Sequence, residues 1–167
     1  MRTLYIWILL LLCLQLHAQQ LTVRQAFVEM PDSLLPYLSN SNRLDLLDYL
    51  DAKMKAEVEN ELEGRTSLLS MGTDSLVLHL NDQHLLTLYV LDVTEPIDSS
   101  QQVIAAAHTY RLSTGEEDHT LRFYSCKWTP LHSRPTLTPQ QTARLPRSSS
   151  SLLRRDDDVF SRKPVEF

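Results

Sequence analysis

Nucleophilic and metal chemistry in proteins most often uses cysteine and histidine, and this 167-residue chain has two cysteines and six histidines. Cys126 falls in a segment, 119–128, with the composition of a strand, on the same strand face as Tyr124 and Trp128. A catalytic thiolate needs a base within hydrogen-bond reach and surroundings that lower its pKa, which a mid-strand position among aromatic residues does not offer. The sequence therefore favours a packed Cys126. A small hydrolase using Cys126 or a histidine cluster is the alternative.

The histidines are spread along the chain without the spacing of a metal-binding motif. No H-E-x-x-H or comparable pattern occurs, although neighbouring strands could bring His79 or His108 beside other histidines. The three glycines cannot build a glycine-rich phosphate loop. We therefore predict no metal site and no cofactor. The histidines that follow residue 18 are His79, His84, His108, His119 and His132.

A run of acidic residues lies within residues 42–60, NRLDLLDYLDAKMKAEVEN. On a helix, Asp45, Asp48 and Asp51 fall in one sector that points away from the leucines. Metal ligands must converge from several directions, whereas aspartates spaced in this way drift around the helix. We therefore interpret the three aspartates as the solvent-facing side of an amphipathic helix.

Aromatic residues alternate along the last two segments that resemble strands. Tyr110, Tyr124 and Trp128 would form an exposed aromatic surface if one face of the sheet were uncovered, with His108 and Arg122 nearby. We assign partner binding to these three aromatic residues, and the alternative is that they line the core. No residue is assigned a catalytic role.

Two segments near the N-terminus have helical patterns. In LTVRQAFVEMP, Thr22 and Gln25 match a capping box and Pro31 ends the helix. A second helix is expected over 43–62, capped by Asn42, with an apolar stripe that packs on a sheet. The stripe consists of Leu47, Leu50, Met54 and Val58.

From residue 66 the apolar period changes from that of a helix to that of a strand. Short polar turns join most of the segments, so consecutive strands should run antiparallel. The connection DVTEPIDSSQ contains Pro96 and is expected to be a longer loop. The predicted fold class is α+β, with N-terminal helices packed on one face of an antiparallel sheet of about five strands. The predicted strands are 66–71, 75–80, 85–91, 102–112 and 119–128.

The two ends of the chain are predicted to lie outside the folded domain. Residues 1–18 combine a positive start, an apolar segment too short to span a bilayer and a small residue, Ala18, as in a secretory signal peptide. Lipid attachment at Cys13 is disfavoured because a leucine precedes it where a small residue is expected. Residues 132–167 are rich in serine, proline and arginine, which is typical of a disordered tail. A single α+β domain is thus expected over 19–131.

The distribution of charge bears on possible partners. Residues 19–131 hold 17 acidic and 8 basic residues, so this part of the chain should repel the phosphates of nucleic acid. After cleavage a single cysteine remains, which cannot form an internal disulfide. We expect a soluble periplasmic or secreted protein with no membrane span after signal cleavage.

The expected function is a binding or interaction module of the cell envelope, because no pattern for catalysis, metal binding or phosphate binding is present. Its partner would be an envelope protein or another ligand of the envelope. A periplasmic chaperone, or an inhibitor of another exported protein, is a further alternative to the hydrolase.

Three segments carry a resemblance to a known family: FVEMPDSLLPYL, NRLDLLDYLDAKMKAEVEN and RFYSCKWTPL. They resemble an uncharacterised family of small exported proteins from Gram-negative anaerobes, a domain of unknown function. The resemblance spans residues 20–131. It implies export and supplies neither an activity nor a functional residue.

Overall fold

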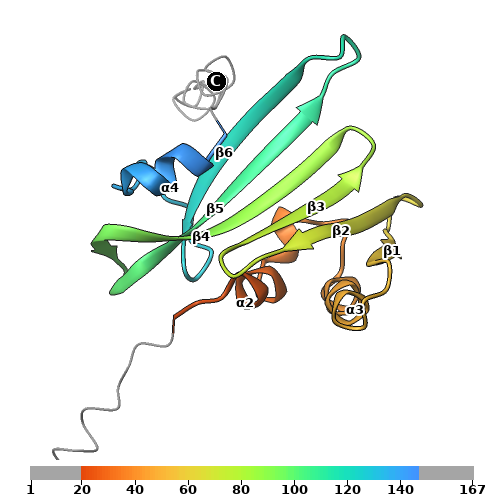
Figure 1. Ribbon diagram of the computed structural model, residues 1–167, viewed down its shortest axis with the longest axis horizontal. Helices are drawn as coiled ribbons and strands as arrows, with labels where there is room; N and C mark the ends of the chain where they lie inside the picture. Colours follow the sequence, from red (N-terminus) through yellow and green to blue (C-terminus); the bar gives the residue numbers. More distant parts are fainter. Residues whose placement is uncertain (1–19, 147–167) are drawn as a thin grey trace, which may run out of the picture.

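The computed structural model describes residues 20–146, in which six strands form one antiparallel sheet (Figure 1). The strand order β1-β2-β3-β4-β5-β6 follows the chain, so each strand pairs with its neighbours in sequence. This confirms the predicted α+β fold with an antiparallel sheet. The predicted signal peptide lies outside the described residues. The strands are β1 (Glu57–Glu59), β2 (Arg65–Met71), β3 (Ser75–Asn81), β4 (His84–Ile97), β5 (Ser100–Arg111) and β6 (Glu117–Ser125).

One face of the sheet carries the main core, which N-terminal helices cover. The short helix α2 (Val23–Val28) begins with the predicted capping box, in which Thr22 and Gln25 bond to each other's backbone N–H groups. It is followed by the single turn η1 (Asp32–Leu34) and by α3 (Asn40–Asp51). Leucines at alternate positions of β3 and β4 meet these helices, as the strand period predicts. The fully buried leucines are Leu76, Leu78, Leu80, Leu86 and Leu88.

Helix α3 is shorter than the sequence predicts. It is capped by Ser39 rather than Asn42 and ends at Asp51, not near residue 62. Lys53 adopts a left-handed conformation with φ 56°. Residues 57–59 then form β1, which pairs with β2 and was not among the predicted strands. The stripe therefore stops early, because Met54 is 61% exposed and Val58 belongs to β1.

The acidic side of α3 is exposed, as predicted. Asp45, Asp48 and Asp51 all point away from the core, where Leu46 and Leu47 are buried. Asp51 forms an ion pair with Arg24 of α2. These aspartates are therefore the solvent-facing side of a packed helix and do not converge on a metal.

The connection between β4 and β5 differs from the predicted loop. The two strands continue to Ile97 and from Ser100, so only two residues separate them. Asp98 and Ser99 both have positive φ, of 51° and 64°, as a tight hairpin turn with the twist of its strands requires. The register shifts between Asp92 and Ile97, and from Asp92 back to His84 the residues of β4 pair one to one with those of β5 from Gln102 to Tyr110.

The opposite face of the sheet carries a second, smaller core that the C-terminal part of the described chain covers. Leu145 is buried against Leu91, Val103 and Phe123. The helix α4 (Pro139–Arg144; blue in Figure 1) has its own capping box, formed by Thr138 and Gln141.

The packed region therefore continues past the predicted boundary at residue 131, as far as residue 146. Two arginine hydrogen bonds to Asp74, of 2.6 and 2.9 Å, fasten Arg144 to the sheet. The apolar side chains and the helix cap hold this segment against the sheet, which its composition alone does not reveal. The remainder of the predicted tail, 147–167, lies outside the described residues.

Candidate functional site

Two histidines and two tyrosines meet at one end of the helix-covered face. His84 opens β4 and pairs in register with Tyr110 of β5, while His108 lies two residues before Tyr110 on the same face. Tyr37, from the chain between η1 and α3, reaches the same place. We call Tyr37, His84, His108 and Tyr110 the histidine cluster.

The cluster is a chain of hydrogen bonds with rings stacked on it. His84 Nε2 lies 2.8 Å from His108 Nδ1, and the hydroxyl of Tyr37 lies 3.4 Å from His84 Nδ1. The ring of Tyr110 stacks on His84 with a centroid separation of 4.4 Å and an interplanar angle of 24°. Both histidines are half-buried, and Tyr110 is 36% exposed. The cluster is thus ordered but open to solvent on one side.

Both imidazoles are neutral at neutral pH. Burial lowers the pKa of His84 below its usual value. Burial, together with the nearby His84 and Arg122, lowers the pKa of His108 to about 4. One N–H lies between the two histidines, so the unprotonated nitrogen of one ring accepts that hydrogen bond and the unprotonated nitrogen of the donating ring can accept another.

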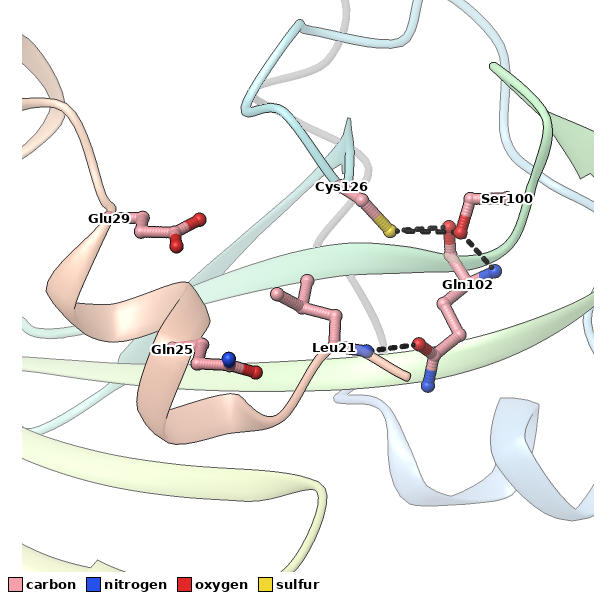
Figure 2. Close-up of a pocket in the computed structure, with 6 residues that line it drawn as sticks. All are labelled: Leu21, Gln25, Glu29, Ser100, Gln102 and Cys126. Carbon is pink, nitrogen blue, oxygen red and sulfur yellow. Dashed lines mark hydrogen bonds between the residues drawn. The ribbon is translucent and has the colours of Figure 1, made fainter. Parts of the chain in front are cut away.

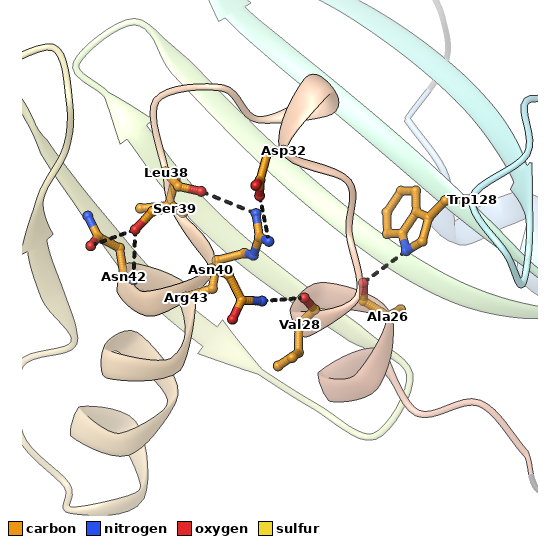
Figure 3. A network of polar contacts seen from close by, with 9 residues as sticks. All are labelled: Ala26, Val28, Asp32, Leu38, Ser39, Asn40, Asn42, Arg43 and Trp128. Atoms are coloured by element: carbon orange, nitrogen blue, oxygen red, sulfur yellow. Dashed lines mark hydrogen bonds and ion pairs between the residues drawn. The ribbon is translucent and has the colours of Figure 1, made fainter.

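The other two aromatic residues assigned to partner binding lie at the other end of the same face. Helix α2 covers this end, and we call it the closed end. Tyr124 and Trp128 are only 4% and 6% exposed, and their ring centroids are 5.3 Å apart. The indole N–H of Trp128 donates to the carbonyl oxygen of Ala26 in α2, at 3.1 Å (Figure 3). Tyr110, Tyr124 and Trp128 therefore do not form one exposed surface, because α2 covers two of the three.

Cys126 lines a pocket of about 190 Å³ between α2 and the start of β5 (Figure 2). Its thiol donates to the carbonyl oxygen of Gln102 at 3.1 Å and lies 3.2 Å from the hydroxyl of Ser100. Neither group is a base, so these contacts do not activate the sulfur as a nucleophile. The pocket is lined by Leu21, Gln25, Glu29, Ser100, Gln102 and Cys126.

A second pocket of about 250 Å³ adjoins the first, because Leu21 and Gln102 line both. Between the two pockets the backbone N–H of Leu21 donates to Gln102 Oε1 at 2.8 Å. Asp74 lies on the wall of the second pocket, and the Arg144 guanidinium lowers the pKa of the Asp74 carboxyl. Most of the remaining wall consists of hydroxyl, carboxamide and carboxylate side chains. They are those of Gln20, Thr22, Thr73, Asp92 and Gln141.

The remaining histidines do not join the cluster. His79 lies on β3 in register with Ser67 and Leu85, His119 lies 3.0 Å from the hydroxyl of Thr109, and His132 is exposed. Within residues 20–146, no three side chains of histidine, cysteine, aspartate or glutamate are grouped as metal ligands. No helix in this part of the chain is long and apolar enough to cross a membrane.

The sequence pointed to His108 and Tyr110 but not to their partners. Tyr37 lies in a proline-rich bend whose path the sequence does not reveal, so nothing in the pattern indicated it. His84 could not have been placed by counting back from the turn at 98–99, because the register between β4 and β5 shifts between Asp92 and Ile97. Leu21, Ser100 and Gln102 carry no signal of their own.

The chain belongs to the family described as "Protein of unknown function (DUF3256)", whose model matches residues 13–158. No curated protein is similar enough to count as a match. Among solved structures, the chain is similar to one described as a domain of an uncharacterized protein from Porphyromonas gingivalis W83, a Gram-negative anaerobe, with 23% sequence identity and a TM-score of 0.53.

That similarity covers 66% of this chain and 54% of the other, so the chain spans about half the length of the protein domain it matches. At this identity the likeness shows the fold alone. The expected membership of a family of unknown function is confirmed.

Proposed function

We propose that this member of the DUF3256 family is an exported, non-enzymatic binding domain of the cell envelope. Its ligand would be a short extended peptide segment of another envelope protein. The observation that carries the proposal is the pair of adjoining pockets on either side of Leu21. Each is smaller than the roughly 300–1,000 Å³ of small-molecule pockets, which favours a ligand that extends across both.

The chemistry of the walls suits a peptide. Carboxamides and hydroxyls both donate and accept hydrogen bonds, as do the N–H and carbonyl groups of an extended backbone. Gln25, Ser100 and Gln141 supply such groups around the two pockets. The thiol of Cys126 donates to a backbone carbonyl and not to a side-chain base, which favours binding over hydrolysis at this place.

Peptide selection against the immobilised protein tests the binding function. Glu29 is exposed at the rim of the first pocket, so Glu29→Lys should weaken the selected peptides about tenfold or more through altered charge and blocked access. Asp45→Lys, the same charge change on an exposed position of α3, is the matched control and should leave affinity within about twofold. Failure to select any peptide, or equal loss in both variants, would contradict the proposal.

Export is the second part of the proposal. The apolar segment from Leu4 to Leu14, followed by the small residue Ala18, supports it, and the family resemblance agrees. N-terminal sequencing of the protein from the periplasmic fraction of its native host should give a start near Gln19. An uncleaved chain in the cytoplasmic fraction would contradict export, and a lipid on Cys13 would contradict a soluble product.

A further inference from the structure

The histidine cluster is distinct from the peptide pockets, and we propose that it binds a divalent transition-metal ion through His84 Nε2 and His108 Nδ1. Zn²⁺, Ni²⁺ and Cu²⁺ are the ions that imidazole nitrogen suits best. Asp92 and Gln102, which line the second pocket, lie eight residues further along the β4–β5 ladder than His84. The metal proposal therefore stands or falls independently of peptide binding.

The spacing of the two ring nitrogens is close to that of a metal site. They face each other from adjacent strands at 2.8 Å. Metal–nitrogen bonds of about 2.0–2.1 Å at a tetrahedral angle place two ligand nitrogens about 3.3 Å apart. To admit the ion, the two nitrogens would separate by about half an ångström and both rings would turn, so that their lone pairs point at the ion instead of along the line between the nitrogens. Water, or a donor from a bound partner, would fill the open positions.

Tyr37 gives the cluster the outer contact that a ligating histidine needs. In metal sites the second ring nitrogen of the histidine donates its proton to an oxygen, which fixes the tautomer and the ring orientation. The Tyr37 hydroxyl lies at that position beside His84 Nδ1, at 3.4 Å. The stacked ring of Tyr110 restrains the imidazole plane. His84 is thus oriented before any metal arrives.

Metal binding requires a change of tautomer but no net loss of protons. The proton between the rings leaves the shared position, and the ring that carried it keeps one proton on its other nitrogen. When that ring is His84, Nδ1 becomes the donor and the Tyr37 oxygen the acceptor, a reversal that a hydroxyl can make. Each imidazole carries one proton before and after this exchange.

One nearby charge opposes a cation. Arg122 lies close enough to His108 to lower its pKa, and the same positive charge would repel a metal ion. Removing that charge should strengthen metal binding. Arg122→Gln should therefore bind the metal ion more tightly than the wild type, a result that loss of the fold would not produce.

Calorimetric titration of the untagged protein with ZnCl₂, NiCl₂ and CuSO₄ at neutral pH tests the site. We expect one ion per chain, tightest for Cu²⁺. His84→Ala and His108→Ala should each weaken binding more than about tenfold, Tyr37→Phe about tenfold, and Arg122→Gln should strengthen it. His132→Ala, at an exposed histidine outside the cluster, should leave affinity within about twofold. Circular dichroism of each variant checks that it is folded.

Two further results decide the matter. Copper bound to the wild type should show nitrogen couplings from two imidazoles by electron paramagnetic resonance, and titrations in buffers of different ionisation enthalpy should show no proton release. Absence of binding at millimolar metal, or unchanged affinity in folded His84→Ala and His108→Ala proteins, would overturn the proposal.

Discussion

Tyr110 and Tyr124 lie on the same face of neighbouring strands, yet one is 36% exposed and the other 4%. At the Tyr124 end, α2 lies over the sheet and its Ala26 carbonyl accepts from Trp128. At the Tyr110 end, the bend that carries Tyr37 approaches the sheet. Exposure along these strands is therefore decided by where the helices lie and not by alternation within the strand. The Tyr124 end belongs to the core, whereas the Tyr110 end has hydroxyl and imidazole groups that a ligand can reach.

The largest expected effect is at the closed end. Trp128→Ala removes a buried indole and its hydrogen bond to α2, so the free energy of unfolding should fall by about 3–5 kcal/mol. Urea unfolding followed by circular dichroism measures the loss. A loss below about 1 kcal/mol would show that this end is not packed as described.

The bend that carries Tyr37 to the open end is held by a buried arginine. Arg43, 2% exposed, donates to the Leu38 carbonyl oxygen at 3.1 Å and to Asp32 at 2.9 Å (Figure 3). Because Asp32 is largely exposed, Arg43→Ala should cost about 2–3 kcal/mol, less than loss of a fully buried ion pair. Chemical-shift changes at His84 should accompany the loss. Unchanged stability would contradict the role of Arg43.

The histidine pair should make stability depend on pH. The pKa of His108, about 4, lies below the unfolded value of 6.5, so the unfolded chain binds more protons in this window. The contribution of neutral His108 to the free energy of unfolding is fully present above pH 6.5 and is lost as the pH decreases toward 4. His108→Leu should remove part of this fall, about 1–2 kcal/mol between pH 7 and 5 after allowance for solvent screening. Equal pH profiles for the two proteins would contradict a buried, neutral His108.

The smallest effect is expected at Tyr110 itself. Its ring is partly exposed and stacks on His84, so Tyr110→Ala should lower the free energy of unfolding by only about 1 kcal/mol. Measured beside Trp128→Ala in the same urea series, it gives the difference between the two ends directly. Equal losses in the two variants would remove the distinction.

Local sequence patterns identified the helices and strands better than the contacts between them. The capping box at Thr22 and the alternating leucines of β3 depend on residues close in sequence, and both are confirmed. The end of α3 was missed because pairing of β1 with β2 outweighs the helical pattern of residues 52–62. The cover over Trp128 could not be predicted, since it depends on a contact with Ala26, 102 residues away in the chain.

The candidate site was predictable in part for the same reason. Strand alternation places His108 and Tyr110 on one face, whereas the register shift between Asp92 and Ile97 prevents the turn alone from placing His84 opposite Tyr110. Tyr37 comes from an irregular bend with no period to follow. The predicted tail was similarly misjudged as far as residue 146, because Leu137 and Leu145 find apolar partners on a sheet face that composition does not reveal.

Trp128 offers the most direct test of the closed end, because it is the single tryptophan of the chain after residue 18. Its fluorescence in the folded protein should be shifted to the blue relative to the urea-unfolded chain and should resist quenching by acrylamide, as a 6% exposed indole packed on α2 requires. An emission maximum and a quenching constant equal to those of the unfolded chain would contradict a buried Trp128, and with it the division of this sheet face into a closed end and an open one.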